Sequence, residues 1–217
     1  MDEAEQIRLS VVRTMRRTLF VTLQTEVVQG DPAVRDYRAR VQVEWSPDNG
    51  PDVDPAGLSE LAHVDVEGFL PEVGSLLPET LVIPVGEGNL VLAELNSAQC
   101  WEELAERSLD LGLVGEALLG EGFDLALLRS TVELVHGRAL IANYMEILPE
   151  WRGAEYGLLS LELAIRELGR CADVAAMYPM RPGLADLEQR AAANRALSAY
   201  WGRMGFVDFN GIMIRPL

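Results

Sequence analysis

The sequence reads Ile147-Leu148-Pro149-Glu150-Trp151-Arg152-Gly153-Ala154-Glu155-Tyr156-Gly157 at the point where its hydrophobic pattern changes. An apolar run over 139–147 leads into this stretch, and residues 158–168 follow it with the spacing of an amphipathic helix. The pattern predicts a strand, a tight loop and the start of a helix. Such a loop directs several backbone N–H groups at one point, and the helix dipole adds positive potential there. The stretch therefore predicts an anion site, typically for phosphate.

This loop resembles the acetyl-CoA loop of the GNAT N-acetyltransferase superfamily, which reads Arg/Gln-x-x-Gly-x-Gly/Ala after a strand end of the type Val-x-Pro-Glu-Tyr. Arg152, Gly153 and Gly157 match that loop, and Glu155 stands where its middle glycine is expected. The resemblance implies that the backbone N–H groups of the loop hold the pyrophosphate of the cofactor. The residues to which it gives a cofactor-binding role are Ile147, Arg152, Gly153, Ala154, Glu155, Tyr156, Gly157, Leu158 and, from a second motif, Asn194.

The second motif reads Asn194-Arg195-Ala196-Leu197-Ser198-Ala199-Tyr200-Trp201-Gly202-Arg203-Met204-Gly205-Phe206. It resembles the GNAT helix signature Asn-x-x-Ala-x-x-x-Tyr-x-x-x-Gly-Phe, because its asparagine and its Gly-Phe pair fall at matching distances. Leu197 replaces the small residue, and Trp201 replaces the tyrosine that in the family often protonates the CoA thiolate. An indole N–H does not ionise usefully. Tyr200 is therefore the substitute acid that we predict.

The two motifs and the elements between them cover about residues 130–217, in the order strand, loop, helix, strand, helix, hairpin. The resemblance implies a fold of the α/β (α+β) class, with a mixed, mostly antiparallel central sheet, flanking helices and a V-shaped splay after the central strand. We expect a single domain over 1–217, with a divergent acidic half (1–125) and a CoA-binding half (126–217). An unrelated α/β domain, in which 147–157 is only a strand-to-helix turn, predicts no splay.

Hydrophobic periodicity and turn residues place the remaining elements. In residues 1–79 they predict a helix giving way to a strand over 3–28, a half-buried strand over 38–45, a loop over 46–55, and a short helix and irregular chain over 57–79. In residues 81–147 they predict a hairpin of 81–85 and 90–95 around Gly86-Glu87-Gly88-Asn89, a helix over 97–119 broken near Gly112 and Gly115 and ended by 120–122, and strands over 131–135 and 139–147. After the central loop they predict a helix over 157–169, a buried strand over 171–178, a helix over 184–204, and closing strands over 207–209 and 212–214 around Asn210-Gly211.

The net charge of −16 is unevenly placed. Residues 1–125 hold 24 acids and 8 arginines, residues 126–217 hold 10 of each, and there is no lysine. An acidic surplus argues against nucleic acid as a partner, because neutralised phosphates supply most of that affinity. The acidity fits either solubility or attraction of a cationic substrate. No metal is predicted, since Cys100 and Cys171 lack metal-type spacing and the acidic loop 46–55 lacks calcium-ligand spacing.

Segment composition predicts a cytoplasmic protein without a membrane partner. No apolar run approaches the roughly 18 residues of a membrane span. The start Met1-Asp2-Glu3-Ala4-Glu5 is acidic, unlike a signal peptide. Two distant cysteines fit a reducing compartment. The apolar closing strands are of a kind that in this fold class often pairs between subunits, so a homodimer is left open.

The resemblance implies transfer of an acyl group from acetyl-CoA, or another acyl-CoA, to the amine of a small molecule or peptide by direct attack. Such a reaction needs a donor to the thioester carbonyl, here a backbone N–H around Ile147, and a base for the amine. The catalytic residues that we predict are Glu146 as base and Tyr200 as acid, with Glu133, His136 and Tyr178 as weaker site candidates. A solvent-facing strand position is the structural alternative for Glu146, and helix packing is the alternative for Tyr200. Because Glu155 and Trp201 depart from the motifs, the alternative function is a degenerate GNAT-fold domain that acts as a non-catalytic ligand-binding or protein-interaction module.

Overall fold

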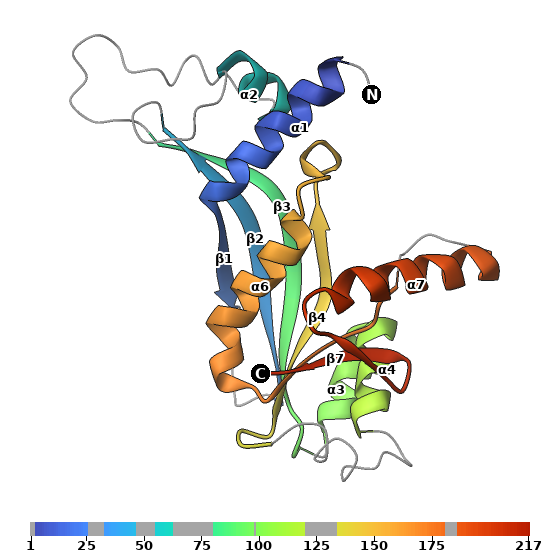
Figure 1. The fold of residues 1–217 in the computed structure, drawn as a ribbon. Coiled ribbons are helices and arrows are strands. Elements are labelled where there is room, and N and C mark those ends of the chain that lie inside the picture. The colour runs from blue at the N-terminus through green and yellow to red at the C-terminus, as the bar shows by residue number, and fades with distance from the viewer. Residues whose placement is uncertain are drawn as a thin grey trace. The chain divides into compact units, whose positions relative to one another are not determined.

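The computed structural model describes residues 3–25, 33–46, 55–62, 80–97, 99–119, 134–180 and 186–217. These residues form a seven-stranded, mostly antiparallel sheet in the order β1-β2-β3-β4-β5-β7-β6, together with six α-helices (Figure 1). The elements are α1 (Glu3–Met15), β1 (Leu19–Thr25), β2 (Val34–Trp45), α2 (Pro55–Ala62), β3 (Leu81–Glu94), α3 (Cys100–Arg107), α4 (Leu109–Leu119), β4 (Arg138–Ile147), α6 (Tyr156–Leu168), β5 (Val174–Met177), α7 (Leu187–Gly202), β6 (Val207–Phe209) and β7 (Ile212–Pro216), with short 3-10 turns η1 (Arg16–Thr18), η3 (Pro149–Trp151) and η4 (Gly169–Cys171). These elements confirm the predicted α/β class and the mixed, mostly antiparallel sheet.

The contacts within the chain divide it into two compact units, each assembled from three segments. The first unit comprises Met1–Leu23, Ala39–Gly88 and Met145–Leu163, and the second comprises Gln24–Arg38, Asn89–Tyr144 and Ala164–Leu217. Each unit has its own hydrophobic core. The division of the chain into halves 1–125 and 126–217 stays a prediction.

The core of the first unit lies between α1, β2, β3 and the loop that follows β4. Its members include Val12, Met15, Val41, Val43, Trp45, Ile83, Val85, Trp151 and Tyr156, each at most 3% exposed. Alternation along β2 buries Ala39, Val41, Val43 and Trp45 on one face, which confirms the half-buried strand predicted over 38–45. The predicted helix followed by a strand at the start of the chain is also confirmed by α1 and β1.

The hairpin predicted over 81–95 is wrong, because β3 runs without interruption from Leu81 to Glu94. Gly86 lies inside this strand. A Cβ atom on Gly86 would come within 2.3 Å of the backbone oxygen of Glu146 and within 2.9 Å of the Ile147 side chain. The glycine therefore permits close approach of the β4 backbone, a role that glycine often has inside strands.

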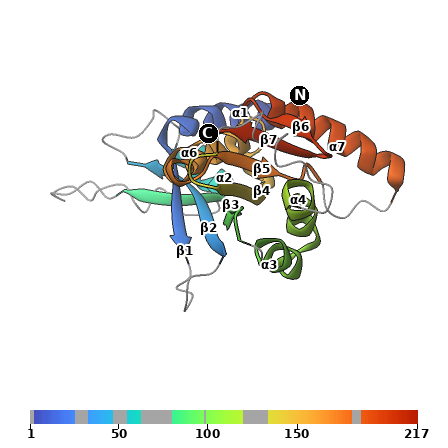
Figure 2. The same ribbon diagram turned by 90° about the horizontal axis from the view of Figure 1, so that it is seen from below.

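The core of the second unit packs α3 and α4 against strands of the sheet, and Figure 2 shows the two helices side by side. The helix break predicted near Gly112 and Gly115 is misplaced, since α3 ends at Arg107 and α4 begins at Leu109. Ser108 lies between them, and its hydroxyl accepts a hydrogen bond from the amide of Leu111 at 3.1 Å, which caps α4. A Cβ on Gly115 would be 3.0 Å from the Trp101 ring, so this glycine lets α3 and α4 approach closely.

The parallel pairing of β4 with β5 is short. It joins residues 139–142 to 174–177, whereas β4 continues to Ile147. β5 pairs antiparallel with β7, and β7 pairs antiparallel with β6. The predicted turn between the last two strands is confirmed, with left-handed φ angles of 52° at Asn210 and 82° at Gly211.

Other predictions are corrected or lie outside the described residues. The buried strand predicted over 171–178 is shorter, because η4 occupies the start of that range. Leu134 and Val135 were predicted as strand but form irregular chain. Outside the described residues lie 131–133 with Glu133, the predicted helix end at 120–122, the loop residues 47–54, and 63–79. None of the helices within the described ranges is long and apolar enough to cross a membrane.

Candidate functional site

The loop between β4 and α6, hereafter the β4–α6 loop (residues 148–155), is anchored at both ends by buried groups. The amide of Leu148 donates to the carbonyl of Val85 on β3 at 2.9 Å. The Trp151 side chain is buried and meets the Tyr156 ring edge-on, with 5.9 Å between centroids. The predicted succession of strand, tight loop and helix start is confirmed. These contacts fix the path of the backbone between Leu148 and Tyr156.

Two residues of this loop have left-handed backbone angles. The φ angle is 101° at Gly153 and 64° at Glu155. A residue with a side chain rarely adopts such an angle, which costs about 1 kcal/mol or more. Glycine adopts it readily, and position 155 is where the GNAT loop has its middle glycine. Glu155 therefore has a backbone conformation that glycine adopts more readily than glutamate.

Helix α6 begins directly after Glu155, whose carbonyl accepts from the amide of Leu159. By helix geometry the first amides of α6 have no partner within the helix, and the dipole makes this end positive. The side chains of Ala154, Tyr156 and Leu158 are buried. These three residues can therefore contribute only backbone groups to a ligand that approaches the loop.

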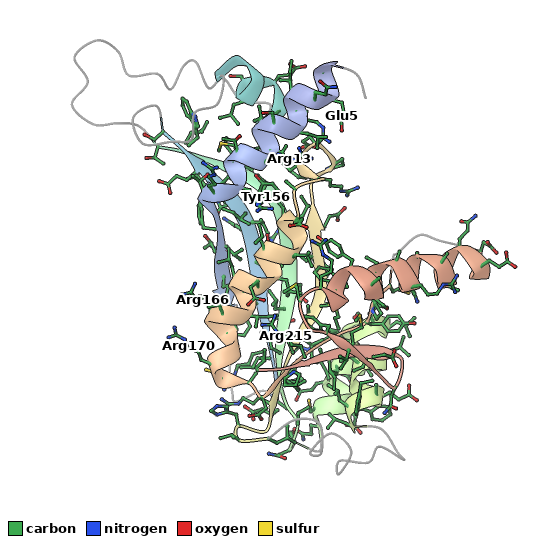
Figure 3. The ribbon with its side chains drawn as sticks, in the orientation of Figure 1. Glu5, Arg13, Tyr156, Arg166, Arg170 and Arg215 are labelled. Atoms are coloured by element: carbon green, nitrogen blue, oxygen red, sulfur yellow. The ribbon has the colours of Figure 1, made fainter. Side chains whose placement is uncertain are left out.

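Helix α1 is hydrogen-bonded to the β4–α6 loop at several points. The Arg8 guanidinium donates to the backbone carbonyls of Glu150 and, at 3.1 Å, Arg152. The same guanidinium makes two bonds to the Glu5 carboxylate, at 2.7 and 2.8 Å. Tyr156 points from α6 toward α1 (Figure 3), where its hydroxyl donates to the carbonyl of Val12 at 2.8 Å. Burial raises the pKa of Tyr156, so the phenol stays protonated as a donor.

Arg16, in the turn that follows α1, forms an ion pair with Glu155. Its Nη1 lies 3.3 Å from Oε2 of the carboxylate, and both side chains are about 40% exposed (43% and 42%). This contact holds the Glu155 carboxylate against a positive charge. The positive charge of Arg16 therefore reduces the repulsion between the Glu155 carboxylate and an anion bound at the loop.

The two predicted polar residues at the strand end bind each other. Arg152 Nε donates to the carbonyl of Ile147 at 2.9 Å, and its Nη2 lies 3.6 Å from Oε1 of Glu146. The side chains are 54% exposed for Arg152 and 70% exposed for Glu146. An ion pair this exposed contributes at most about 1 kcal/mol. The predicted base is therefore a solvent-accessible carboxylate at the end of β4.

The residues of the second motif lie on α7, in the second unit. With its amide nitrogen turned toward them, Asn194 donates to the carbonyls of Pro179 at 3.0 Å and Arg190 at 3.1 Å. Its side chain thus ties α7 to the segment that follows β5. Tyr200 and Trp201 are half-buried and meet edge-on, with 4.9 Å between ring centroids.

His136 and Tyr178, two of the weaker site candidates, lie in the second unit. His136 is exposed, and its amide donates to the carboxylate of Asp173 at 2.8 Å. Tyr178 is half-buried and packs against the core of that unit. Among the residues that the structure describes, no group of three or more His, Cys, Asp or Glu could hold a metal ion.

Arg8 and Arg16 contact the β4–α6 loop, but the sequence motifs do not include them. One sequence signal was available, because four of the eight arginines in residues 1–125 fall within 8–17. That concentration of positive charge in an acidic half marks α1 as a helix that faces anionic or carbonyl groups.

The sequence matches no protein-family model, and no curated protein matches it significantly.

Proposed function

We propose that the protein is a cytoplasmic, CoA-dependent N-acyltransferase of the GNAT type. It transfers the acetyl group of acetyl-CoA, or the acyl group of another acyl-CoA, to an amine by direct attack. The acceptor is a small molecule or a peptide, and the acidic composition of residues 1–125 favours a cationic one.

One observation carries this proposal: the left-handed backbone of Glu155 immediately before α6, with its carboxylate paired to Arg16. The left-handed angle supports the proposal because it gives the loop the backbone course that a glycine would give at this position of the motif. The ion pair supports it because the added carboxylate is already balanced by a cation. The positive potential at the amino-terminal end of α6 then favours a pyrophosphate at this position.

The end of β4 supplies the second requirement, a fixed backbone around Ile147. The peptide unit from Ile147 to Leu148 is held at its oxygen by Arg152 and at its N–H by Val85. Gly86 has no Cβ atom, which would otherwise clash with the backbone oxygen of Glu146 in the preceding peptide unit. Because the N–H of Leu148 is engaged by Val85, this peptide unit fixes the end of β4, and the donation to the thioester carbonyl is assigned to a neighbouring N–H. A donor on a rigid backbone spends no reorganisation energy during the reaction.

The strand pairing also supports the proposal. The bonds between β4 and β5 end at Ala142 and Met177, and β4 extends five residues further. An early end of pairing is what the V-shaped splay of the resemblance requires, and the unrelated α/β alternative does not require it. The order β4, loop, α6, β5, α7 and closing hairpin is the order that the resemblance implies.

A second function, a GNAT-fold module that binds CoA without catalysis, is favoured by specific contacts. Glu146 is exposed and paired with Arg152, which lowers its availability as a base. Trp201 occupies the position of the family's tyrosine acid, and Tyr200 lies against it. These contacts concern the residues proposed for proton transfer, whereas CoA binding is assigned to the backbone of the loop. The two functions therefore differ in turnover and share CoA binding.

Calorimetry with acetyl-CoA tests the shared part, with the matched variants Gly157→Glu and Gly157→Gln. Both side chains have nearly the same size, and a negative charge in the first turn of α6 favours the helix. We expect micromolar binding by the wild type and much weaker binding by Gly157→Glu than by Gly157→Gln. Equal affinities of the two variants, or no binding by the wild type, would contradict the proposal.

Release of the CoA thiol from acetyl-CoA in the presence of an amine panel then separates the two functions. We expect amine-dependent thiol release, with cationic amines as the better acceptors. Binding of acetyl-CoA without any thiol release across the panel would favour the non-catalytic module.

A further inference from the structure

Arg8 and Arg16 contact the β4–α6 loop, Arg152 lies within it, and the three differ in how fully the protein engages them. Arg8 is bonded to a carboxylate through two nitrogens and to two backbone carbonyls. Arg152 bonds the carbonyl of Ile147 and pairs with Glu146. For Arg16 the structure shows one side-chain bond within the described residues, to Glu155 at 3.3 Å. Of the three guanidinium groups, that of Arg16 is the least engaged.

The position of Arg16 is also distinctive. Its partner Glu155 is the residue immediately before α6. The charge of Arg16 acts on the phenol of Tyr156, the first residue of that helix, and opposes the rise in the pKa of Tyr156. The ion pair with Glu155 therefore places the guanidinium beside the amino-terminal end of α6. A side-chain cation from a distant part of the chain thus lies where the helix end is already positive.

The Arg16–Glu155 pair has the features of an exchangeable contact. The bond between the two side chains is 3.3 Å long, and about 40% of each side chain (43% and 42%) is exposed to solvent. Pairs of this kind are weak, because water solvates both partners and the side chains lose freedom on pairing. A phosphate presents more negative charge and more acceptor oxygens than a carboxylate, and guanidinium binds it in two-point geometry. A phosphate that reached the loop would compete successfully for Arg16.

We infer that Arg16 is a phosphate-binding residue of this site and that the Glu155 carboxylate takes the place of that phosphate when the site is empty. A ligand that carries a phosphate ester or phosphoanhydride displaces the carboxylate from Arg16 and is held between this guanidinium and the amides of the loop. The inference rests on the proposed function, because it names the side chain that binds the phosphates of the cofactor.

This exchange predicts effects of opposite sign for the two partners. Arg16→Gln removes a cation that binds the ligand, so we expect CoA to bind roughly tenfold more weakly, the low end for a hydrogen bond to a charged group. Glu155→Gln removes a competing carboxylate, so CoA should bind about two- to fivefold more tightly, as expected for loss of one exposed ion pair. If the pair only braced the loop, both substitutions would weaken binding.

The test is calorimetric titration with CoA of the wild type, Arg16→Gln, Glu155→Gln and two controls. Arg17→Gln removes the same charge one residue away, and Glu150→Gln removes an acid from the same loop. Both controls should bind within about twofold of the wild type, since an exposed charge without a ligand contact contributes little. Thermal unfolding checks that each variant is folded. Tighter binding by Glu155→Gln supports the inference even if Arg16→Gln fails to fold.

The outcomes separate this inference from the proposed function. Loss of affinity in both variants, or affinities equal to the wild type, would overturn the role of Arg16 while CoA binding by the wild type leaves the proposed function in place. Absence of CoA binding by the wild type would overturn both. Repetition with dephospho-CoA identifies the group that is bound: an effect of Arg16→Gln that persists assigns it to the pyrophosphate, and one that disappears assigns it to the 3′-phosphate.

Discussion

The carboxylate of Asp173 accepts a hydrogen bond of 2.6 Å from the backbone amide of Gly137. It also accepts bonds from the three neighbouring amides, those of Val135, His136 and Arg138, at 2.8 to 3.2 Å. Asp173 is 3% exposed, so its carboxylate is largely withdrawn from water, although Val135 and His136 are themselves exposed. The turn before β4 is therefore built around a buried carboxylate, which explains why its first residues do not continue as a strand.

We expect Asp173→Asn to destabilise the protein by about 3 kcal/mol. An amide in place of the carboxylate presents only one acceptor oxygen, so buried or part-buried backbone amides of the turn lose their partner. Each loss at a buried position costs about 1–3 kcal/mol. Chemical denaturation measures the free energy of unfolding. The matched control is Asp208→Asn on the exposed side of β6, for which we expect a change within about 0.5 kcal/mol. Equal effects of the two substitutions would contradict the assignment.

The same carboxylate predicts a dependence of stability on pH. Burial alone would raise the pKa of Asp173, but the hydrogen bonds from the surrounding amides outweigh burial and lower the pKa below its ordinary value. A lowered pKa in the folded state means that this stabilisation is present above the unfolded pKa of about 3.9 and is lost as the pH falls through the folded value.

Denaturation of the wild type and Asp173→Asn between pH 7 and pH 2 measures this contribution. The difference in the free energy of unfolding should stay constant down to about pH 5 and shrink below pH 4. A difference that is constant over the whole range would show that the pKa of Asp173 is the same in the folded and unfolded states.

Gly86→Ala tests the close approach of β3 and β4 beside the candidate site. The new Cβ would meet the backbone oxygen of Glu146 at 2.3 Å, which requires the strands to move apart. We expect a loss of about 2–3 kcal/mol, as for other substitutions that overpack an interior. Gly202→Ala is the matched control, because nothing lies within 4 Å of its Cβ position at the end of α7. It should be neutral or stabilising by up to about 1 kcal/mol.

Tyr156→Phe tests the attachment of α1 to α6. The substitution removes the buried bond from the phenol to the carbonyl of Val12. We expect a loss of about 1–2 kcal/mol in the free energy of unfolding. Tyr144→Phe, at a residue that is 44% exposed, should change it by less than about 0.5 kcal/mol. A loss as small for Tyr156→Phe would mean that the hydroxyl contributes nothing to holding α1.

The sequence predicted elements well where one local pattern decides them. Alternation over 38–45 and the change of period around 147–157 each identify an element without reference to distant residues. Gly86 shows where this fails: a glycine between apolar residues has the same appearance in a turn and in a strand that must admit another backbone. The choice depends on Glu146, which is 60 positions away. The helix break was misplaced for the same reason. Gly112 and Gly115 permit close packing against α3, whereas the capping hydroxyl of Ser108 sets the boundary between the two helices.

The candidate site was predictable in its loop and not in its surroundings. The residue types of 147–157 define a strand end and a helix start, which is enough to expect an anion site. The contacts of Arg8 and Arg16 join residues about 140 positions apart, and no periodicity or spacing relates them. The left-handed φ angle of Glu155 could not be predicted either, because a glutamate in a sequence gives no indication of such a conformation.

Glu146→Gln tests the role of the exposed carboxylate at the end of β4. If Glu146 accepts the proton of the attacking amine, kcat should fall at least about 100-fold, the usual lower limit for loss of a general base. The affinity for CoA should change less than about twofold, since the carboxylate lies in an exposed pair with Arg152. The acidic limb of the pH dependence of kcat/KM should disappear with it. Glu150→Gln, in the same loop, is the control and should keep kcat. A variant of Glu146 that retains kcat would confine this residue to pairing with Arg152, and proton transfer would then have to be assigned to another group.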